Sequence, residues 1–383
     1  MEFKPTEEQQ LIAETVREFA EAEIRPHVRE WDEAQSFPDE LLRKMGELGL
    51  MGVMVPEEYG GAGLGSLELS TVMEELGRVD PAVALAVAAH NGLCVGHLMV
   101  GASEEQKRRY LPKLATAEWI GAWGLTEPQA GSDAAGTQTR AVRDESRGGW
   151  VIAGSKTFNT NGARADVAVV HAVTDPGAGS KGISAFVVER GTRGFRVGRK
   201  EDKLGMRASD TVELILEDCF VPDANVVGAV HGGFVDALKV LDRGRISIAA
   251  LSVGIAQGAL EAAIDYVHER QQFGRPIGSF EAIQSKIARM ATRVRASRLL
   301  TMRAATLRQM QLPFKTLASM AKLYASESAM HVSEEAVQIY GGYGYVKDYP
   351  VEKYFRDAKL CTIGEGTSEI QRLVISRQLL AEA

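Results

Sequence analysis

The chain has 383 residues, of which 45% are hydrophobic and 25% are charged, and this balance predicts two or three packed units with a real core. The 44 Lys and Arg against 51 Asp and Glu leave a net charge of -7, which argues against a nucleic-acid-binding protein because such proteins usually carry a basic surplus. A local basic pocket for a phosphorylated ligand is compatible with this charge, and composition alone names no function.

The N-terminal third of the chain is predicted to be helical. Thr6 and Gln9 have the spacing of a capping box, and apolar residues then recur along one helical face. Residues 67–79 predict a second helix, and residues 82–100 are so rich in Ala, Val and Leu that a helix there should be buried on most sides. The glycine-rich stretch 60–65 lacks the spacing of a dinucleotide-binding loop, so we expect an ordinary loop.

The sequence changes in character near residue 119, where glycines and β-branched residues become frequent. Four short runs have the spacing of strands in an antiparallel sheet or barrel: 150–153, 167–170, 183–188 and 212–216. The stretch 149–157 resembles a Walker loop but has Ser155 where the lysine belongs. A strand, a turn and a returning strand explain it better than a nucleotide site does.

From residue 232 onward, apolar residues again recur at helical spacing, in several separate stretches that continue to the C-terminus. The sequence therefore predicts an α+β chain of three domains. These are an N-terminal helical domain (1–119), a central antiparallel β-domain (120–228) and a C-terminal helical domain (229–383).

No pattern in the chain indicates a metal site, a disulfide scaffold or a hydrolase. The seven histidines show no pair at metal-ligand spacing, and we expect His90 and His97 to be packed in the apolar helix. The three cysteines are widely separated, and no Gly-x-Ser-x-Gly elbow is present. The first residues show no secretory signal, and the apolar windows 82–89 and 246–256 are too short to span a bilayer. We therefore expect a cytoplasmic protein that does not bind membranes.

Three segments could carry chemistry. The loop 124–136 is crowded with small residues, hydroxyls and backbone donors that could contact a polar ring edge or a pyrophosphate, although it could also be an ordinary connection. The segment 338–344 has two glycines that would let a backbone approach a ligand, or simply end a helix. The segment 363–375 holds Glu365 between two glycines, just ahead of a helix that Thr367 or Ser368 could cap.

Six segments, taken in order and at these separations, resemble motifs of the acyl-CoA dehydrogenase family over essentially the whole chain: 125–133, 156–162, 205–211, 269–274, 338–342 and 365–368. The resemblance implies a helical domain, a middle β-domain and a C-terminal four-helix bundle. It also implies a flavoenzyme that oxidises an acyl-CoA to its trans-2-enoyl-CoA and passes the electrons to an electron-transfer flavoprotein. In such enzymes a carboxylate removes the α-proton while a hydride leaves the β-carbon for flavin N5, and the matching base is Glu365.

The resemblance also implies binding residues. Those implied to contact FAD in the same subunit are Trp123, Leu125, Thr126, Gly131, Ser132, Phe158, Asn159, Thr160, Thr367 and Glu369. Those implied to reach the FAD of a neighbouring subunit, in a homo-oligomer that is usually a tetramer, are Arg270, Phe273, Gln338, Gly341 and Gly342. Those implied to lie near the CoA or the thioester are Ser132, Asp242, Arg245 and Gly366.

Residues 242–245 bear on the identity of the base and on the length of the acyl chain. Some relatives place the base on a helix of the third domain, but the matching residue here is Gly244, so the base should be Glu365. The pattern at 242–245 looks closest to short-chain, butyryl-type members, while branched short-chain and medium-chain substrates stay open. Asn159, Glu281 and Glu369 depart from the commoner family residues. An acyl-CoA oxidase on the same fold and a non-catalytic flavin- or CoA-binding protein are the competing interpretations.

Overall fold

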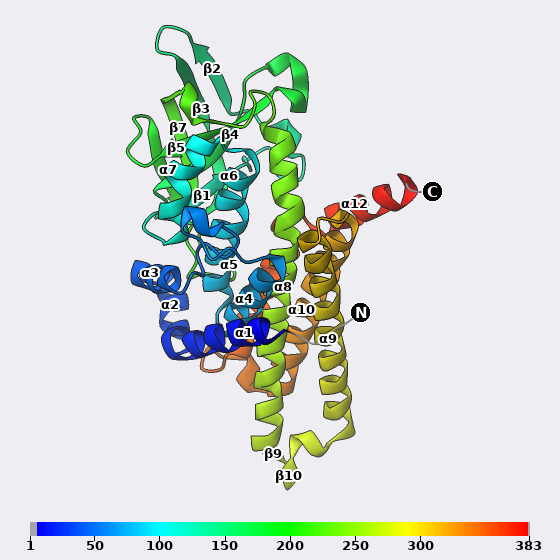
Figure 1. Cartoon of the computed structure of the whole chain (residues 1–383). Helices are drawn as coiled ribbons and strands as arrows, with labels where there is room; N and C mark the ends of the chain where they lie inside the picture. Colours follow the sequence, from blue (N-terminus) through cyan, green and yellow to red (C-terminus); the bar gives the residue numbers. More distant parts are fainter. Residues whose placement is uncertain (1–5, 382–383) are drawn as a thin grey trace.

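One long helix, α8 (Gly233–Glu269), connects the parts of the fold in this computed structural model, which describes residues 6–381. Its 37 residues span about 55 Å at roughly 1.5 Å per residue. The sheet lies beside the N-terminal end of α8, the first helices pack against its middle, and the β9–β10 turn lies at its far end (Figure 1).

The N-terminal part is helical, as predicted. Its helices are α1 (Glu7–Phe19), α2 (Val28–Ala34), α3 (Asp39–Glu47), α4 (Ser66–Val79), α5 (Pro81–Ala88), α6 (Gly96–Gly101) and α7 (Glu104–Ala115). The capping box is confirmed, because Thr6 Oγ1 accepts a hydrogen bond from the Gln9 N–H at 3.2 Å and the Gln9 side chain accepts one from the Thr6 N–H at 3.1 Å. The predicted apolar helix is two helices joined by a π-helical turn, Ala89–Val95, and all of α5 is buried.

The middle part is a mixed sheet. Its strands are β1 (Gly121–Gly124), β2 (Arg140–Asp144), β3 (Gly149–Thr160), β4 (Val167–Val173), β5 (Ile183–Glu189), β6 (Phe195–Lys200), β7 (Thr211–Pro222) and β8 (Val226–Val227). The strand order is β6-β7-β3-β2-β4-β5-β8, with β1 paired to β4. Most neighbours are antiparallel, as predicted, whereas β1–β4 and β2–β4 are parallel, so the sheet is mixed. These parallel pairs join strands that are distant along the chain, so local spacing does not reveal them.

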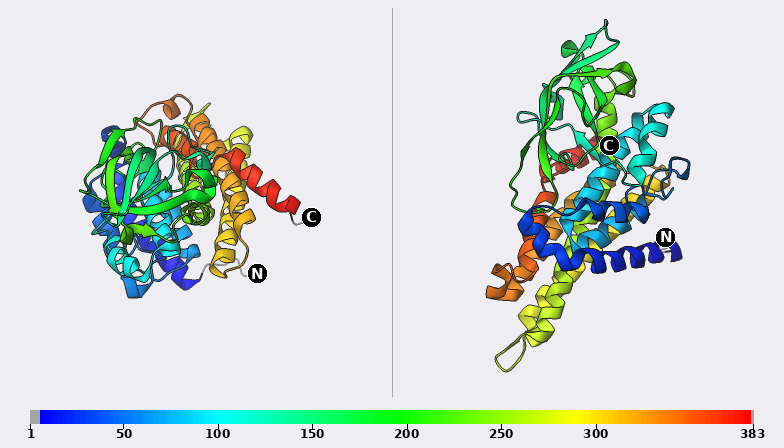
Figure 2. Two further views of the ribbon diagram at one scale, coloured as in Figure 1. Left: turned by 90° about the horizontal axis from the view of Figure 1, so that it is seen from above. Right: turned by 90° about the vertical axis from the view of Figure 1, so that its left-hand side faces the viewer.

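The C-terminal part is a bundle of long helices. After α8 come β9 (Gln271–Gln272), β10 (Arg275–Pro276), α9 (Glu281–Gln309), α10 (Lys315–Tyr340), α11 (Val351–Cys361) and α12 (Ser368–Ala381). The helix α10 packs against α8, α9, α11 and α12. The helix α12 projects away from the other helices and keeps Leu380 78% exposed (Figure 2).

Two helical segments, Pro81–Gly101 and Gly233–Glu269, are long and apolar enough to cross a membrane by length and composition. In both, 83% of the most apolar window is buried inside the fold, as in the core helices of globular domains. His90 is packed in the first segment as expected: its Nε2 lies 3.0 Å from the Leu114 carbonyl and its Nδ1 accepts the Gly121 N–H at 3.1 Å.

Candidate active site

The turn that carries Glu365 joins α11 to α12 and is conformationally unusual. Glu365 has φ +52° and Gly366 has φ +95°, and a non-glycine residue in this left-handed region is uncommon and often marks a functional site. Thr367 Oγ1 accepts the Ile370 N–H at 3.3 Å, so Thr367 rather than Ser368 caps α12. Among residues 6–381 the backbone N–H of Glu365 has no acceptor.

The Glu365 carboxylate lies over Gly244 in α8. A Cβ built on Gly244 would be only 1.9 Å from Glu365 Oε2, so a glycine is required there while the carboxylate keeps this position. Oε2 is buried and has no hydrogen-bond partner among the residues that the structure describes. The sequence identified both residues, and the structure brings them into contact although they are far apart in the chain.

Two cations lie close to the Glu365 carboxylate. Burial raises the pKa of Glu365 to about 7, against the opposing charges of Lys322 and Arg245. Arg245, predicted as a substrate contact, donates to Asp242 Oδ1 at 2.7 Å and to Ser319 Oγ at 3.1 Å.

Lys322 lies in α10, is fully buried, and donates from Nζ to the carbonyl of Gly366 at 2.6 Å. Gln371 Nε2 donates to the same carbonyl at 3.0 Å. The backbone of the Glu365 turn is therefore held from two helices. Sequence reasoning missed both residues, although a lysine inside a row of alanines at helical spacing was a signal for Lys322.

A buried ion pair fixes the loop that follows β1. Glu127 Oε1 lies 2.6 Å from Lys156 Nζ of β3, and the carboxylate also accepts the Gln138 N–H at 2.7 Å and the Thr139 N–H at 3.0 Å. Although burial opposes it, the Lys156 ammonium holds the pKa of Glu127 down at about 2. The Thr157 N–H donates to the Thr126 carbonyl at 2.8 Å, which ties the loop to β3.

The predicted cofactor contacts on this loop and on β3 differ in accessibility. Phe158 has φ +57° beside a break in the β3–β7 register and keeps 65% of its surface exposed. The hydroxyls of Thr126, Ser132 and Thr160 make no hydrogen bond within residues 6–381, so they are free to meet a ligand. Asn159 is 1% exposed and its amide donates to two backbone carbonyls, so its side chain does not face solvent.

The other residues predicted to contact FAD in the same subunit range from buried to exposed. Leu125 is buried, Gly131 is exposed, and Glu369 is exposed in the first turn of α12. Trp123 is half-buried, and its Nε1 donates to His97 Nδ1 at 3.2 Å, which confirms that His97 is packed.

The remaining predicted contacts lie at the far end of α8, where Arg270, Gly341 and Gly342 line one pocket of about 670 Å³. Phe273 is 93% exposed in the β9–β10 turn, and Gln338 is exposed near the end of α10. Arg270 is 26 residues beyond Gly244 on a continuous helix, about 39 Å away at roughly 1.5 Å per residue. These residues therefore cannot contact the same small molecule as Glu365 within one chain.

Known proteins match this chain along its whole length. The acyl-CoA dehydrogenase N-terminal domain matches residues 6–118, the middle domain residues 122–219 and the C-terminal domain residues 231–380. The chain belongs to the acyl-CoA dehydrogenase family. It is accordingly an oxidoreductase that acts on acyl-CoA.

Individual relatives agree with this assignment. The short-chain-specific acyl-CoA dehydrogenase of Clostridium acetobutylicum is 48% identical over 379 residues, which are 99% of this chain and 100% of that protein. The solved structure of butyryl-CoA dehydrogenase from Megasphaera elsdenii is 42% identical with a TM-score of 0.97, over 99% of this chain and 100% of that chain. A chain from work on the electron transferring flavoprotein of Acidaminococcus fermentans is 47% identical with a TM-score of 0.97, with the same coverage.

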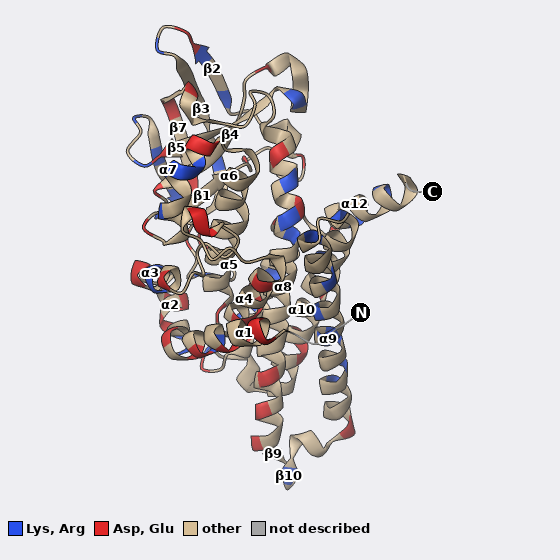
Figure 3. Ribbon diagram, viewed as in Figure 1, with Lys and Arg blue, Asp and Glu red and all other residues tan. Residues whose placement is uncertain are grey.

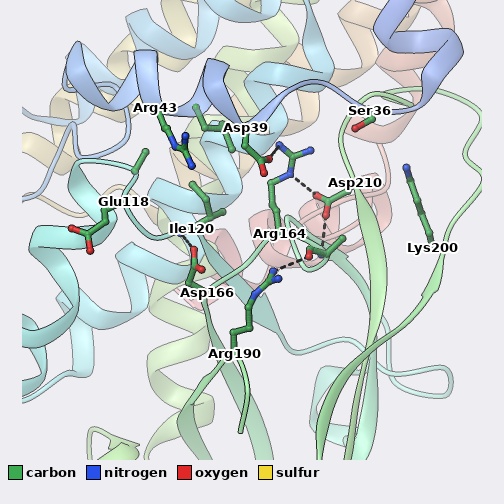
Figure 4. A pocket seen from close by; sticks show the side chains of 13 residues that line it. Ser36, Asp39, Arg43, Glu118, Ile120, Arg164, Asp166, Arg190, Lys200 and Asp210 are labelled. Carbon is green, nitrogen blue, oxygen red and sulfur yellow. Dashed lines mark hydrogen bonds and ion pairs between the residues drawn. The ribbon is translucent and has the colours of Figure 1, made fainter.

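A second pocket of this family member, about 470 Å³ in volume, lies between α3 and the sheet (Figure 4). Its lining holds four basic and four acidic side chains: Arg43, Arg164, Arg190, Lys200, Asp39, Glu118, Asp166 and Asp210. Arg164 donates to Asp39 Oδ1 at 2.8 Å, and Arg190 donates to the Ala165 carbonyl at 2.8 Å. Its acidic and basic side chains are equal in number, and no predicted site residue lines it. We therefore interpret this pocket as a gap at the packing boundary between the N-terminal helices and the sheet, and not as a binding site.

Proposed function

We propose that the chain is an FAD-dependent acyl-CoA dehydrogenase that converts a short- or medium-chain acyl-CoA to its trans-2-enoyl-CoA, with Glu365 as the base. One observation carries this proposal: Glu365 lies in a strained turn with its carboxylate over a glycine, and its Oε2 is buried without a hydrogen-bond partner among the described residues. A buried carboxylate oxygen without a partner lowers the stability of the fold, and such strained, unpartnered groups are typical of functional sites.

Proton removal explains why burial of Glu365 is useful. The α-proton of a thioester is too weakly acidic for a solvated carboxylate, and a base works best when its pKa lies near the working pH. Burial raises the pKa of Glu365 to about 7, which meets this condition. The free backbone N–H of Glu365 is a donor for the thioester oxygen, on which negative charge develops as the proton leaves.

The cofactor residues fit FAD. The exposed aromatic ring of Phe158, which sits on a backbone with positive φ, and the free hydroxyls of Thr126, Ser132 and Thr160 suit a flat ring system with a polar edge. When bound, FAD supplies the acceptor for the hydride that leaves the β-carbon. Residues of this chain hold the substrate and the base, with Arg245, Asp242 and Gly366 assigned to the thioester and CoA side.

Neighbouring copies of the chain complete the cofactor site in this proposal. Arg270, Phe273, Gln338, Gly341 and Gly342 are too far from Glu365 to serve the same flavin, so we assign them to the FAD of another subunit. This division requires a homo-oligomer, for which we propose a tetramer located in the cytoplasm. The domains proposed for each subunit are 1–119, 120–228 and 229–383.

We propose an electron-transfer flavoprotein as the electron acceptor. The support is the similarity to a chain from work on such a flavoprotein in Acidaminococcus fermentans. An oxidase would instead release peroxide in step with substrate consumption.

Anaerobic titration of the FAD-loaded protein tests the proposal. Butyryl-, isovaleryl-, hexanoyl- and octanoyl-CoA are added separately, while the loss of oxidised flavin absorbance and the enoyl-CoA product are measured. We expect bleaching with at least one thioester and one enoyl-CoA per flavin. Subsequent reoxidation by an electron-transfer flavoprotein, but not by oxygen, supports the dehydrogenase. Absence of bleaching with every thioester would contradict the proposal.

A further inference from the structure

The rings of His97, Trp123 and His171 pack against one another at the end of β1. His97 lies in α6, Trp123 in β1, and His171 in β4, the strand that pairs with β1. The centroid of the His171 ring lies 5.0 Å from that of His97 and 4.9 Å from that of Trp123, and both contacts are edge to face. Both histidines are fully buried, whereas Trp123 is half-buried.

Each of the two histidines makes one hydrogen bond, and both bonds go to the last two residues of β1. Trp123 Nε1 donates to His97 Nδ1 at 3.2 Å, so a neutral His97 carries its proton on Nε2. His171 Nδ1 lies 3.1 Å from the Gly124 carbonyl, which can only accept, so His171 carries its proton on Nδ1. Burial lowers the pKa of His97 to about 4 and that of His171 well below its usual value, which keeps both rings neutral at pH 7.

Packing alone does not account for these two histidines. The Nε2 atoms of both are buried and have no hydrogen-bond partner in the part of the chain that the structure describes. A buried polar atom without a partner lowers the stability of the fold, and an apolar side chain of similar size would avoid this loss. The segments α6, β1 and β4 contain no Lys, Arg, Asp or Glu, and the ribbon of α6 is tan in Figure 3. The two imidazoles therefore supply the polar side-chain contacts at the end of β1.

The end of β1 leads directly into the proposed flavin site. Gly124 packs against β3, because a Cβ built on it would lie 3.0 Å from Lys156 Cγ. Thr126 follows two residues later, and its carbonyl accepts the N–H of Thr157, the residue before Phe158, at 2.8 Å. A shift at the end of β1 would therefore move the loop that carries Thr126 relative to the exposed ring of Phe158.

We propose that His97 and His171 are positioning residues of the flavin site. His97 fixes the indole of Trp123, and His171 fixes the carbonyl of Gly124, so that the end of β1 and the loop after it keep the conformation that receives FAD. This inference rests on the proposed function, because it needs FAD at this loop. Both histidines act through β1 and not by touching the cofactor.

The FAD dissociation constant tests this role, and equilibrium dialysis of the FAD-loaded protein measures it. His97→Leu removes the acceptor of the Trp123 hydrogen bond, and we expect the FAD dissociation constant to rise about tenfold, as the loss of one buried hydrogen bond predicts. His97→Asn offers Oδ1 as an acceptor at the place of Nδ1 and should recover most of this affinity. His171→Leu leaves the Gly124 carbonyl without its donor and should also weaken FAD binding.

A double-mutant cycle and a matched control separate positioning from general destabilisation. Trp123→Phe keeps a ring but has no N–H, so it should itself weaken FAD binding, and His97→Leu should change the FAD dissociation constant little in this background. His90→Leu is the control, because His90 is equally buried in the same apolar segment and also bonds to β1, but at Gly121, the end away from the loop. We expect His90→Leu to lower the Tm and to keep an FAD dissociation constant close to that of wild type.

Turnover of butyryl-CoA is measured separately on the same proteins. If wild type binds FAD but turns over no thioester, the proposed function fails, whereas the FAD dissociation constants still test the two histidines. An unchanged FAD dissociation constant in His97→Leu, an equal rise in the Trp123→Phe background, or an equal rise in His90→Leu would each overturn the inference. If His97→Leu does not fold, an unchanged FAD dissociation constant in Trp123→Phe would overturn it in the same way.

Discussion

Substitution of Gly244 by alanine should lower the rate of flavin reduction without lowering the stability of the fold. The added Cβ would lie 1.9 Å from Glu365 Oε2 and 3.0 Å from its Cδ. To reach even the tightest tolerated contact of 3.0 Å, the carboxylate must move by 3.0 − 1.9 = 1.1 Å. A displacement of about 1 Å costs roughly 100-fold in rate when the reacting geometry is strict. Alanine in a helix is itself about 1 kcal/mol more favourable than glycine, and the clash involves a flexible side chain.

Rapid mixing with butyryl-CoA under anaerobic conditions measures the rate of flavin reduction, and thermal unfolding measures stability. We expect a rate about 100-fold lower in Gly244→Ala and a Tm no lower than that of wild type. Gly254→Ala on the same helix is the contrast, because its Cβ would lie 2.3 Å from the backbone oxygen of Glu74 and should lower the Tm. A wild-type reduction rate in Gly244→Ala would mean that the base does not act from its position over this glycine.

Three further outcomes follow from the buried charges. Lys322→Met removes a charge that lowers the pKa of Glu365, so the acidic limb of the kcat–pH profile should move to higher pH. Lys322→Arg keeps the charge and should leave this limb at lower pH than in Lys322→Met, and an unmoved limb in Lys322→Met would contradict this role of Lys322. Glu365→Gln should be more stable than wild type by up to about 3 kcal/mol at alkaline pH, and equally stable near pH 4, as measured by urea unfolding at both pH values. The reason is that the pKa of Glu365 is raised from 4.5 in the unfolded chain to about 7 in the folded one, so ionisation of the carboxyl destabilises the folded state as the pH rises through this range. Lys156→Met leaves Glu127 charged and buried, and should cost about 3–5 kcal/mol in urea unfolding, with partial recovery in Lys156→Met/Glu127→Gln.

The sequence was sufficient to predict those elements of the fold that depend on interactions between near neighbours in the chain. The Thr6 cap involves neighbours three residues apart, the apolar helix needs only its composition, and the four predicted strands all lie within strands of the structure. Glycines on both sides of Glu365 predicted a carboxylate open to a ligand, and this accessibility stays a prediction because Glu365 Oε2 is buried. In each case the pattern within one turn or one strand carried the information.

Interactions between distant segments leave no local pattern in the sequence, so they could not be predicted from it. The parallel pairing of β1 with β4 needs a long crossover, and Glu127 of the loop after β1 meets Lys156 of β3 although they lie 29 residues apart in the chain. The positive φ of Phe158 contradicts the extended conformation that an aromatic residue usually adopts in a strand. Lys322 reaches the Glu365 turn from a third helix, and no local pattern records that packing.

The role of Glu365 as the base is tested by comparing wild type with Glu365→Gln in one anaerobic mixing experiment. Both proteins are loaded with FAD and mixed with butyryl-CoA while the oxidised flavin absorbance is followed. We expect the flavin of wild type to bleach, whereas Glu365→Gln should retain FAD and its oxidised spectrum because no group remains to take the α-proton. Rapid bleaching of the Glu365→Gln protein would show that Glu365 is not the base.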